Sequence, residues 1–425
     1  MNAPDHRREF AVEVVRQLRD AGFEALWAGG CVRDQLLGKD PKDYDVATSA
    51  RPEEVRKVFG HQRTLAIGAS FGVISVVGNR QQGHIEIATF RQDAGYSDGR
   101  RPDSVTFSSA EEDAKRRDFT INGIFFDPLR DEVIDYVGGQ QDLNNKTIRA
   151  IGNADDRIAE DKLRMLRGIR FAATYGFDLD PETFDAIRNH ADWLSAVSRE
   201  RIAAEVHRMF SHPQRGLAAS YLVESGLYRT VFDSSLLEFE NLKESIELIG
   251  LLDSTNFATA MAAFLLPLWQ HDLQDRKQVQ ALKTALHDWK YSNEETQAVV
   301  WLLKSYPFLL SASDQNWPQV QRKLVDDLGQ ELFNLAVACS VHHQNRYQES
   351  ILYCHQKLEL PAEQLNPAPL IDGEDLIQAG YSPGPMFKES LDRIRDLQLN
   401  GAIDSREEAL REVEKFFNDK GQATS

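Results

Sequence analysis

Cysteine is scarce in this sequence. Three cysteines, Cys31, Cys339 and Cys354, occur among 425 residues, and none belongs to a C-x-x-C pair. An odd number without that spacing argues against both a disulfide framework and a cysteine-based zinc site. We therefore expect a protein of a reducing compartment, which predicts a cytoplasmic location.

Long apolar runs are missing as well. The N-terminal segment "MNAPDHRREF" lacks the apolar core of a signal peptide, and the most apolar tract, residues 257–269, is too short to span a bilayer. The sequence therefore predicts no membrane segment and a buried helix over 257–269. It indicates no protein partner.

A surplus of positive charge is absent. The chain carries 66 Asp and Glu against 49 Lys and Arg, a formal net charge of −17. This excludes a protein that binds nucleic acid simply by being basic, because phosphate contacts need local cations. Residues 149–215 differ from the acidic average, since they hold as many basic as acidic residues and their arginines are clustered. A site for a polyanion is expected there or in the arginine-rich segment just before it.

Two common phosphate-binding patterns are also absent, the P-loop G-x-x-x-x-G-K-[ST] and the dinucleotide motif G-x-G-x-x-G. The chain instead has "GGCVRDQLLGKDPKDYDVAT" at residues 29–48. Gly29 and Gly30 allow the backbone to approach a phosphate, and the helix expected after them directs its N–H groups and Arg33 to the same point. This stretch therefore predicts a phosphate site without a P-loop.

The same stretch holds two carboxylates, Asp43 and Asp45, two residues apart. If residues 44–47 form a strand, as their pattern indicates, the two side chains project from one face. Glu86 in "HIEIATF" lies on a second expected strand and can join them. Such hard oxygen ligands suit Mg²⁺, and three carboxylates can hold two ions that serve phosphoryl transfer. The alternative is a solvated strand end, because Asp-x-Asp arises often by chance in an acidic chain.

The pattern of secondary structure changes along the chain. Helices and strands mix up to about residue 148, with helices expected over 10–22 and 51–60 and strands over 25–28, 72–78 and 84–90. Thr48 and Ser49 are expected as helix caps. After residue 153 only helices are expected, and residues 175–184 mark a turn in which Asp180 caps the next helix. The pattern predicts a mixed α/β part followed by an all-α part.

Five sequence blocks occur in a characteristic order: "GGCVRDQLLGKDPKDYD", "IEIATFR", "YSDGRRPDSVTF", "AKRRDFTINGIFFDP" and "RIAEDKLRMLRGIRFA". With these blocks the chain resembles the polymerase β-like nucleotidyltransferases, in the subgroup of tRNA CCA-adding enzymes and bacterial poly(A) polymerases. The segments "PLIDGEDLIQAGYSPGPMF" and "GAIDSREEALREV" are similar to the tail of this family. The resemblance implies an α+β nucleotidyltransferase head with a small mixed sheet (1–148), followed by an all-α neck (149–215), body (216–340) and tail (341–425).

The resemblance also implies a role for each matching residue. Asp43, Asp45 and Glu86 are expected to hold Mg²⁺ and to form the catalytic centre. The residues "DGRR", 98–101, correspond to a mobile loop that the family uses when it switches from C to A addition. Nucleotide-binding residues are expected in the head at Gly30, Arg33, Arg116, Arg117 and Asp118, the last three holding sugar and triphosphate, and in the neck at Asp161, Arg164, Arg167 and Arg170.

In this family, the residues matching Asp161 and Arg164 read the incoming base in place of a nucleic-acid template. The chemistry agrees, because a carboxylate accepts from the exocyclic amine of cytosine or adenine while a guanidinium donates to a ring acceptor. Uracil and guanine carry a carbonyl where that amine stands, so one Asp/Arg pair can admit CTP and ATP and reject UTP and GTP. For Arg164, Arg167 and Arg170, the alternative is a solvated, salt-bridged helix face.

The resemblance implies addition of C and A to the 3′ end of tRNA from CTP and ATP, with release of pyrophosphate. Three alternatives stay open: addition of A only, a poly(A) polymerase, and a non-catalytic RNA-binding protein. The arginine-rich "GRRFR"-like insertion associated with poly(A) polymerases is missing, and "LAIGASFGVISV" (65–76) stands in its place. The dipeptide His271–Asp272 is typical of metal phosphohydrolases, but no partner histidine has a suitable spacing, so a surface dipeptide is expected.

Overall fold

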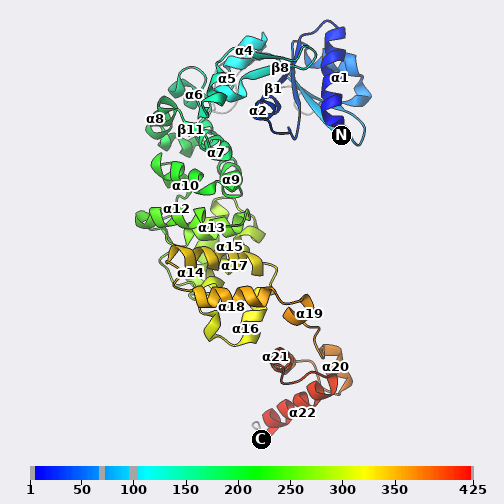
Figure 1. Ribbon diagram of the computed structural model, residues 1–425, viewed down its shortest axis with the longest axis vertical. Helices are drawn as coiled ribbons and strands as arrows, with labels where there is room; N and C mark the ends of the chain where they lie inside the picture. Colours follow the sequence, from blue (N-terminus) through cyan, green and yellow to red (C-terminus); the bar gives the residue numbers. More distant parts are fainter. Residues whose placement is uncertain (1–4, 67–71, 95–103, 423–425) are drawn as a thin grey trace. The chain divides into compact units, whose positions relative to one another are not determined.

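The computed structural model of the protein describes residues 5–66, 72–94 and 104–422. It divides into two compact units, Met1–Asp233 and Ser234–Ser425. The first unit contains the sheet, whereas the second has no strand among its described residues (Figure 1). The loop 98–101, expected to act in the switch from C to A addition, lies outside the described residues.

The first unit is built around a seven-stranded sheet of order β3-β4-β5-β2-β1-β8-β9. Its strands are β1 (Ala25–Ala28), β2 (Asp45–Thr48), β3 (Thr64–Leu65), β4 (Val73–Val77), β5 (His84–Thr89), β8 (Ile124–Asp127) and β9 (Glu132–Asp135). Neighbouring strands are antiparallel except β2 and β5, which run parallel. This confirms the small mixed sheet predicted for the head. A separate antiparallel hairpin consists of β6 (Arg91–Ala94) and β7 (Ser104–Phe107).

Helix α1 (His6–Asp20) packs on the sheet against β1 and β2. It begins earlier than the predicted helix over 10–22, because the side chain of Asp5 accepts hydrogen bonds from two backbone N–H groups of its first turn. Phe10, Val14 and Leu18 recur at the helical period and are fully buried. Apolar burial therefore holds α1 on β1 and on β2, the strand that begins at the predicted metal ligand Asp45.

Two local predictions about residues 44–49 were wrong. The N-cap of α3 (Pro52–Phe59) is Arg51, not Thr48 or Ser49. The two hydroxyls instead bond the backbone of Glu24: Thr48 Oγ1 donates to its carbonyl oxygen (2.6 Å), and Ser49 Oγ accepts from its N–H (2.9 Å). They thus join the end of β2 to the start of β1. Because β2 begins at Asp45, Asp43 precedes the strand and does not lie on it.

Residues 175–184 contain a strand that the sequence did not predict. Strand β11 (Asp178–Leu179) pairs in parallel with β10 (Thr147–Ile148). Two residues are too few to show an alternating pattern, so no sequence signal marked it. The predicted cap is confirmed, since Asp180 accepts from the N–H of Thr183 at the start of α8 (Pro181–Asn189).

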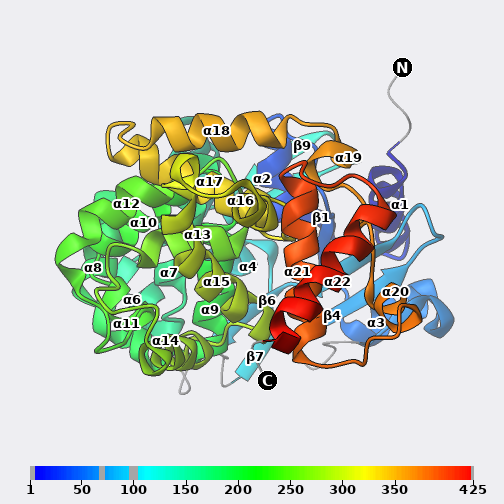
Figure 2. The same ribbon diagram turned by 90° about the horizontal axis from the view of Figure 1, so that it is seen from below.

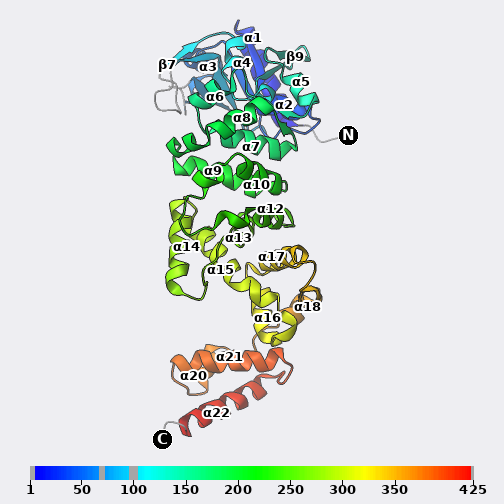
Figure 3. The same ribbon diagram turned by 90° about the vertical axis from the view of Figure 1, so that its left-hand side faces the viewer.

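Along the chain, the other helices of the first unit come between the strands of the sheet or after its last strand. They are α2 (Gly30–Leu36), α4 (Ala110–Lys115), α5 (Gly139–Asn144), α6 (Ala154–Glu160), α7 (Arg164–Tyr175), α9 (Arg199–Phe210), α10 (Arg215–Glu224) and α11 (Tyr228–Val231). Figure 3 shows α7, α9 and α10 packed side by side. This packing places the arginines of α7 beside α9.

The second unit is helical throughout its described part, as predicted. Its helices are α12 (Leu242–Gly250), α13 (Phe257–Leu265), α14 (Arg276–Asp288), α15 (Asn293–Leu309), α16 (Trp317–Leu324), α17 (Gly329–His342), α18 (Gln348–Leu358), α19 (Ala362–Leu365), α20 (Gly373–Gln378), α21 (Pro385–Leu399) and α22 (Arg406–Gln422). Every residue of α13 is buried, which confirms the buried helix predicted there. In Figure 2, α17 lies beside α16 and α18. Among the helices of the described ranges, none has the length and apolarity needed to cross a membrane.

Candidate active site

Two of the three predicted catalytic carboxylates lie on adjacent strands. In the parallel pair of β2 and β5, Asp45 is the register partner of Glu86. Glu86 is exposed between the buried Ile85 and Ile87, so it projects from the sheet surface as expected. Residues far apart in the chain thus meet at one point of the sheet because two strands pair.

The three carboxylates affect one another electrostatically. Although Asp45 is exposed at the start of β2, nearby protein atoms displace part of its hydration. Together with the negative charge of Glu86 and the smaller effect of Asp43, this raises the pKa of Asp45 to about 6. Arg117 opposes this rise. A bound cation would relieve the repulsion, so the donor set fits a hard divalent ion such as Mg²⁺. Within the described ranges, no three His, Cys, Asp or Glu side chains already stand in ligand positions for a metal.

The glycine turn before α2 is surrounded by arginines. Gly29 has φ 71° and ψ −126°, a conformation that residues with a Cβ rarely adopt. A Cβ on Gly29 would lie 3.1 Å from Nη1 of Arg117, and one on Gly30 would lie 3.6 Å from Nη2 of Arg33. The missing side chain of Gly29 therefore lets the guanidinium group of Arg117 approach the backbone where a phosphate was predicted, whereas a Cβ on Gly30 would make only an ordinary contact with Arg33.

Arg33 is held firmly beside this turn. It is 7% exposed, and it donates to Asp34 Oδ1 from Nε (3.0 Å) and Nη2 (2.9 Å) and to Asn122 Oδ1 from Nη1 (2.6 Å). Its guanidinium also lies 4.7 Å from the ring centre of Tyr175 on α7. The side chain predicted to bind nucleotide thus also connects the glycine turn with the neck.

Arg116 and Arg117 share one carboxylate, Asp113 of α4. Nε and Nη2 of Arg116 donate to its Oδ1 (2.9 and 2.7 Å), and the same atoms of Arg117 donate to its Oδ2 (3.3 and 2.9 Å). Burial by itself raises the pKa of Asp113, but the two guanidinium groups outweigh it and the pKa lies below the usual range. The sequence interpretation missed Asp113, although its spacing of three and four residues to the arginines was a usable signal.

Asp118 lies in a buried network between head and neck. Its Oδ2 accepts from Nε of Arg167 on α7 (2.9 Å), and its Oδ1 accepts from the N–H of Phe119 (2.8 Å) and from Nδ2 of Asn122 (2.9 Å). Burial raises its pKa, but the charge of Arg167 and these hydrogen bonds dominate and lower it to about 2. In this structure, the residue expected to hold sugar and triphosphate is occupied by protein partners.

The predicted base-reading pair stands at the junction of α6 and α7. Asp161 directly follows α6, and both its oxygens accept from Nη2 of Arg201 on α9, at 3.0 Å (Oδ1) and 2.8 Å (Oδ2). Arg164 begins α7 and donates to Glu160 Oε2 (2.6 Å) and to the carbonyl oxygen of Arg116 (3.2 Å). The pair therefore adjoins the predicted triphosphate arginines. Sequence patterns could not reveal Arg201, because only the packing of α9 brings it to Asp161.

The remaining predicted arginines are paired on neighbouring elements. Arg167 bonds Asp118 of the head, and Arg170 donates from Nε to Glu205 of α9 while its guanidinium lies over the ring of Phe171 (4.1 Å). The alternative of a solvated, salt-bridged helix face fits only in the ion pairs, because Arg167 and Arg170 are half-buried and their partners belong to other elements and not to α7 itself.

Comparison with known proteins decides the family. Three family models match the chain: "Poly A polymerase head domain" over residues 25–149, "Probable RNA and SrmB-binding site of polymerase A" over 176–236, and tRNA nucleotidyltransferase domain 2 over 257–413. The CCA-adding enzyme of Enterococcus faecalis is 34% identical over 423 residues, 97% of both chains. That of Lactobacillus helveticus is 32% identical over 412 residues, 96% of both chains. The chain belongs to the CCA-adding enzyme family. It is a nucleotidyltransferase.

Solved structures of CCA-adding enzymes share the fold. The Bacillus stearothermophilus CCA-adding enzyme in complex with CTP has a TM-score of 0.73 and 27% identity, and the match covers 99% of this chain and 100% of that one. The Thermotoga maritima CCA-adding enzyme complexed with tRNA has a TM-score of 0.67 and 21% identity, with 96% and 94% covered. These matches confirm the predicted α+β head followed by helical domains.

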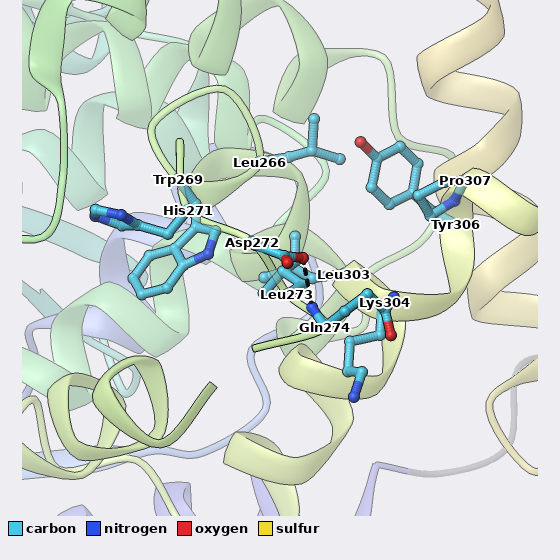
Figure 4. Close-up of a pocket in the computed structure, with 10 residues that line it drawn as sticks. All are labelled: Leu266, Trp269, His271, Asp272, Leu273, Gln274, Leu303, Lys304, Tyr306 and Pro307. Carbon is cyan, nitrogen blue, oxygen red and sulfur yellow. Dashed lines mark hydrogen bonds between the residues drawn. The ribbon is translucent and has the colours of Figure 1, made fainter. Parts of the chain in front are cut away.

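The second unit of this CCA-adding enzyme family member has a pocket around the His271–Asp272 dipeptide. Figure 4 shows His271 and Asp272 pointing in different directions at its rim. Asp272 Oδ1 accepts from the N–H of Gln274 (2.7 Å), and the ring of His271 packs edge-on against Trp269 (5.0 Å between centres). The dipeptide thus shapes a turn, which agrees with the expected surface role.

Proposed function

We propose that the protein adds C and A to the 3′ end of tRNA. In this reaction the RNA 3′-hydroxyl attacks the α-phosphate of CTP or ATP and pyrophosphate leaves. The observation that carries the proposal is the proximity of two sites in the first unit. Asp45, the register partner of Glu86, interacts electrostatically with Arg117, and Arg164 bonds the backbone of the adjacent Arg116. The relatives are CCA-adding enzymes, and solved members are complexes with CTP, ATP or tRNA.

Asp43, Asp45 and Glu86 would hold Mg²⁺. When bound, the ion would supply Lewis-acid polarisation of the phosphate and lower the pKa of the attacking hydroxyl. Desolvation and the charges of Glu86 and Asp43 together raise the pKa of Asp45. The part that the two charges contribute supports this assignment, because crowded carboxylates favour a cation between them. Asp43 lies just before β2, where the chain can still turn its carboxylate toward Asp45.

The arginines around the glycine turn would hold the triphosphate. Arg33 and Arg117 approach Gly30 and Gly29, and Arg116 shares the carboxylate of Asp113 with Arg117. Guanidinium groups bind phosphate oxygens with two parallel hydrogen bonds, so braced arginines can orient the α-phosphate for attack. Asp118 and Arg167 would act by joining the head to α7, and Arg170 would act by joining α7 to α9, since each is engaged with protein partners.

Asp161 and Arg164 would select the base. Arg201 bonds both oxygens of Asp161 and keeps it an acceptor, which suits the exocyclic amine of cytosine and adenine. Arg164 begins α7, and bonds to Glu160 and Arg116 hold its guanidinium. A carbonyl in place of the amine, as in UTP or GTP, would face a carboxylate and be rejected.

The division of labour along the chain is also a proposal. Residues 1–148 would form the catalytic head and 149–215 the neck that binds base and RNA. The body, 216–340, and the tail, 341–425, would hold the tRNA by its shape and phosphates. The cytoplasmic location stays a prediction from cysteine content.

Nucleotide incorporation tests the function. Three tRNA transcripts ending at the discriminator base, at CC and at CCA are offered CTP, ATP or both, with Mg²⁺. The proposal expects the first to gain CCA and the second to gain A, after which both stop, while the third is unchanged. A single A on the CC transcript alone identifies an A-adding enzyme, and long A tails identify a poly(A) polymerase. Tight binding without incorporation identifies a non-catalytic RNA-binding protein.

A further inference from the structure

Asp113 holds two arginines with one carboxylate. It is 1% exposed, and it gives Oδ1 to Arg116 and Oδ2 to Arg117, each through two donors. We infer that Asp113 is a positioning residue for phosphate recognition, which sets the directions of Arg116 and Arg117 toward the triphosphate. This inference rests on the proposed function.

The geometry of Arg117 supports the inference. Nε and Nη2 are used on Asp113, and Nη1 donates to the carbonyl oxygen of Asn122 (3.2 Å). Nη1 is also the atom that a Cβ on Gly29 would meet at 3.1 Å. The edge turned away from Asp113 is therefore the edge that faces the glycine turn. If Asp113 were lost, this planar group could rotate and no longer present that edge.

The negative charge of Asp113 also affects triphosphate binding, and this effect has the opposite sign to that of positioning the arginines. One carboxylate between two guanidinium groups lets the two cations lie close together. Its lowered pKa is consistent with a carboxylate that stays ionised. Removing its charge would raise the local positive charge and by itself attract a triphosphate more strongly. Loss of positioning would weaken binding, so the sign of the change separates the two effects.

Asp113 also anchors the helix that carries it. Its Oδ1 accepts from the backbone N–H of Arg91, the first residue of β6 (3.3 Å). Helix α4 is thereby tied to the start of β6, which follows directly after β5, the strand of Glu86. Asp113 thus joins the phosphate arginines to the hairpin that directly follows the strand of Glu86.

The experiment compares full-length wild-type protein with Asp113→Asn and Asp113→Glu. Binding of inorganic tripolyphosphate and of CTP is measured by calorimetry, and incorporation is measured with CTP and ATP. Both variants are expected to lose about tenfold or more in tripolyphosphate affinity and in kcat/KM, equally for CTP and ATP, because phosphate recognition is independent of the base. Asp127→Asn is the control, since Asp127 is also buried and paired with an arginine, Arg19 (2.8 Å).

Several outcomes would overturn the inference. Tripolyphosphate binding by Asp113→Asn that equals or exceeds that of wild type would show that charge alone matters. A changed ratio of CTP to ATP incorporation would place the effect at the base site. Equal losses in Asp127→Asn would indicate a general effect of disturbing the head.

Folding is monitored through Tm, and Asp113→Glu keeps the charge if Asp113→Asn unfolds. A third variant set, Arg116→Gln/Arg117→Gln with and without Asp113→Glu, tests whether Asp113 affects tripolyphosphate binding through these two arginines. Once both arginines are gone, Asp113→Glu should cause no further loss of tripolyphosphate binding. A wild type that binds tripolyphosphate but incorporates no nucleotide contradicts the proposed function, whereas the binding data still decide the role of Asp113.

Discussion

Asp45 and Glu86 meet because β2 and β5 run parallel and in register. At the scale of single residues, the sequence identified the charged groups of the site, while their partners came from the structure. Each of three residues that the sequence did not single out binds a predicted nucleotide-binding side chain. Asp113 binds Arg116, Arg201 binds Asp161, and Glu205 binds Arg170. Asp113 and Arg201 fix side chains that would touch substrate, and Glu205 fixes Arg170 against α9. A motif-based interpretation missed all three because they act through neighbouring residues.

Asp43→Ala is expected to lower kcat for nucleotide incorporation by at least about a hundredfold, because it removes a predicted Mg²⁺ ligand and the charge that helps polarise the site. Binding of tRNA, measured by filter retention, should be retained. Asp40→Ala serves as control, since Asp40 is exposed in the same stretch. Wild-type-like incorporation by Asp43→Ala would refute the metal assignment.

Asp161→Asn is expected to change which bases are accepted. Because Arg201 donates to residue 161, an asparagine there would turn its oxygen toward Arg201 and its NH₂ group toward the base. A donor in that place fits the carbonyl of uracil or guanine. The preference for CTP over UTP should therefore fall by about tenfold or more, measured as a ratio of kcat/KM values. Asp155→Asn, in the helix α6 that Asp161 follows, serves as the control. An unchanged ratio of kcat/KM values for CTP and UTP in Asp161→Asn would contradict base reading by Asp161.

At the scale of elements, the site depends on how short segments are joined. The glycine turn connects β1 to α2, the junction of α6 and α7 carries Asp161 and Arg164, and α9 packs along α7. Helix α7 is tied to the head by Arg167 and Asp118 and to α9 by Arg170 and Glu205. The periodicity of the sequence predicted the longer strands and helices. Strand β11 was missed and the start of β2 was placed one residue too early, because both depend on pairing with other strands.

Asp118→Asn is expected to destabilise the protein in a pH-dependent way. The folded-state pKa of Asp118 is lowered from 3.8 to about 2, so its ionised form contributes stability above pH 4 that is lost as the pH falls toward 2. One pKa unit corresponds to about 1.4 kcal/mol, so the variant should lose roughly 2 kcal/mol at pH 7 and less near pH 3. Urea unfolding at both pH values measures the difference. An equal loss at pH 7 and pH 3 would contradict this coupling.

At the scale of the whole molecule, an acidic chain has to bind a polyanion. The net charge of −17 means that attraction to tRNA comes from local arginines and not from the general field. The two compact units divide the chain near residue 233. Because each unit buries its own core, the binding surface can be spread over both while the chemistry stays in the first.

Binding of tRNA is therefore expected to weaken steeply with salt. Each neutralised phosphate releases a counterion, so log Kd should rise linearly with log salt concentration and affinity should fall by about tenfold or more between about 50 and 200 mM salt. Fluorescence titration with a labelled transcript measures the slope. A Kd that does not change with salt would contradict binding through phosphate contacts.

The amino-acid sequence by itself determined the composition of the site and the class of the fold. Local patterns are enough for this, because glycine conformations, helix caps and strand alternation depend on neighbouring residues, and the order of motifs identifies the family. The tertiary structure alone decided which distant residues meet. Strand pairing placed Glu86 beside Asp45, helix packing brought Arg201 to Asp161, and pairing with Arg167 lowered the pKa of the buried Asp118. Such contacts depend on long-range packing and desolvation, which no short window of sequence contains.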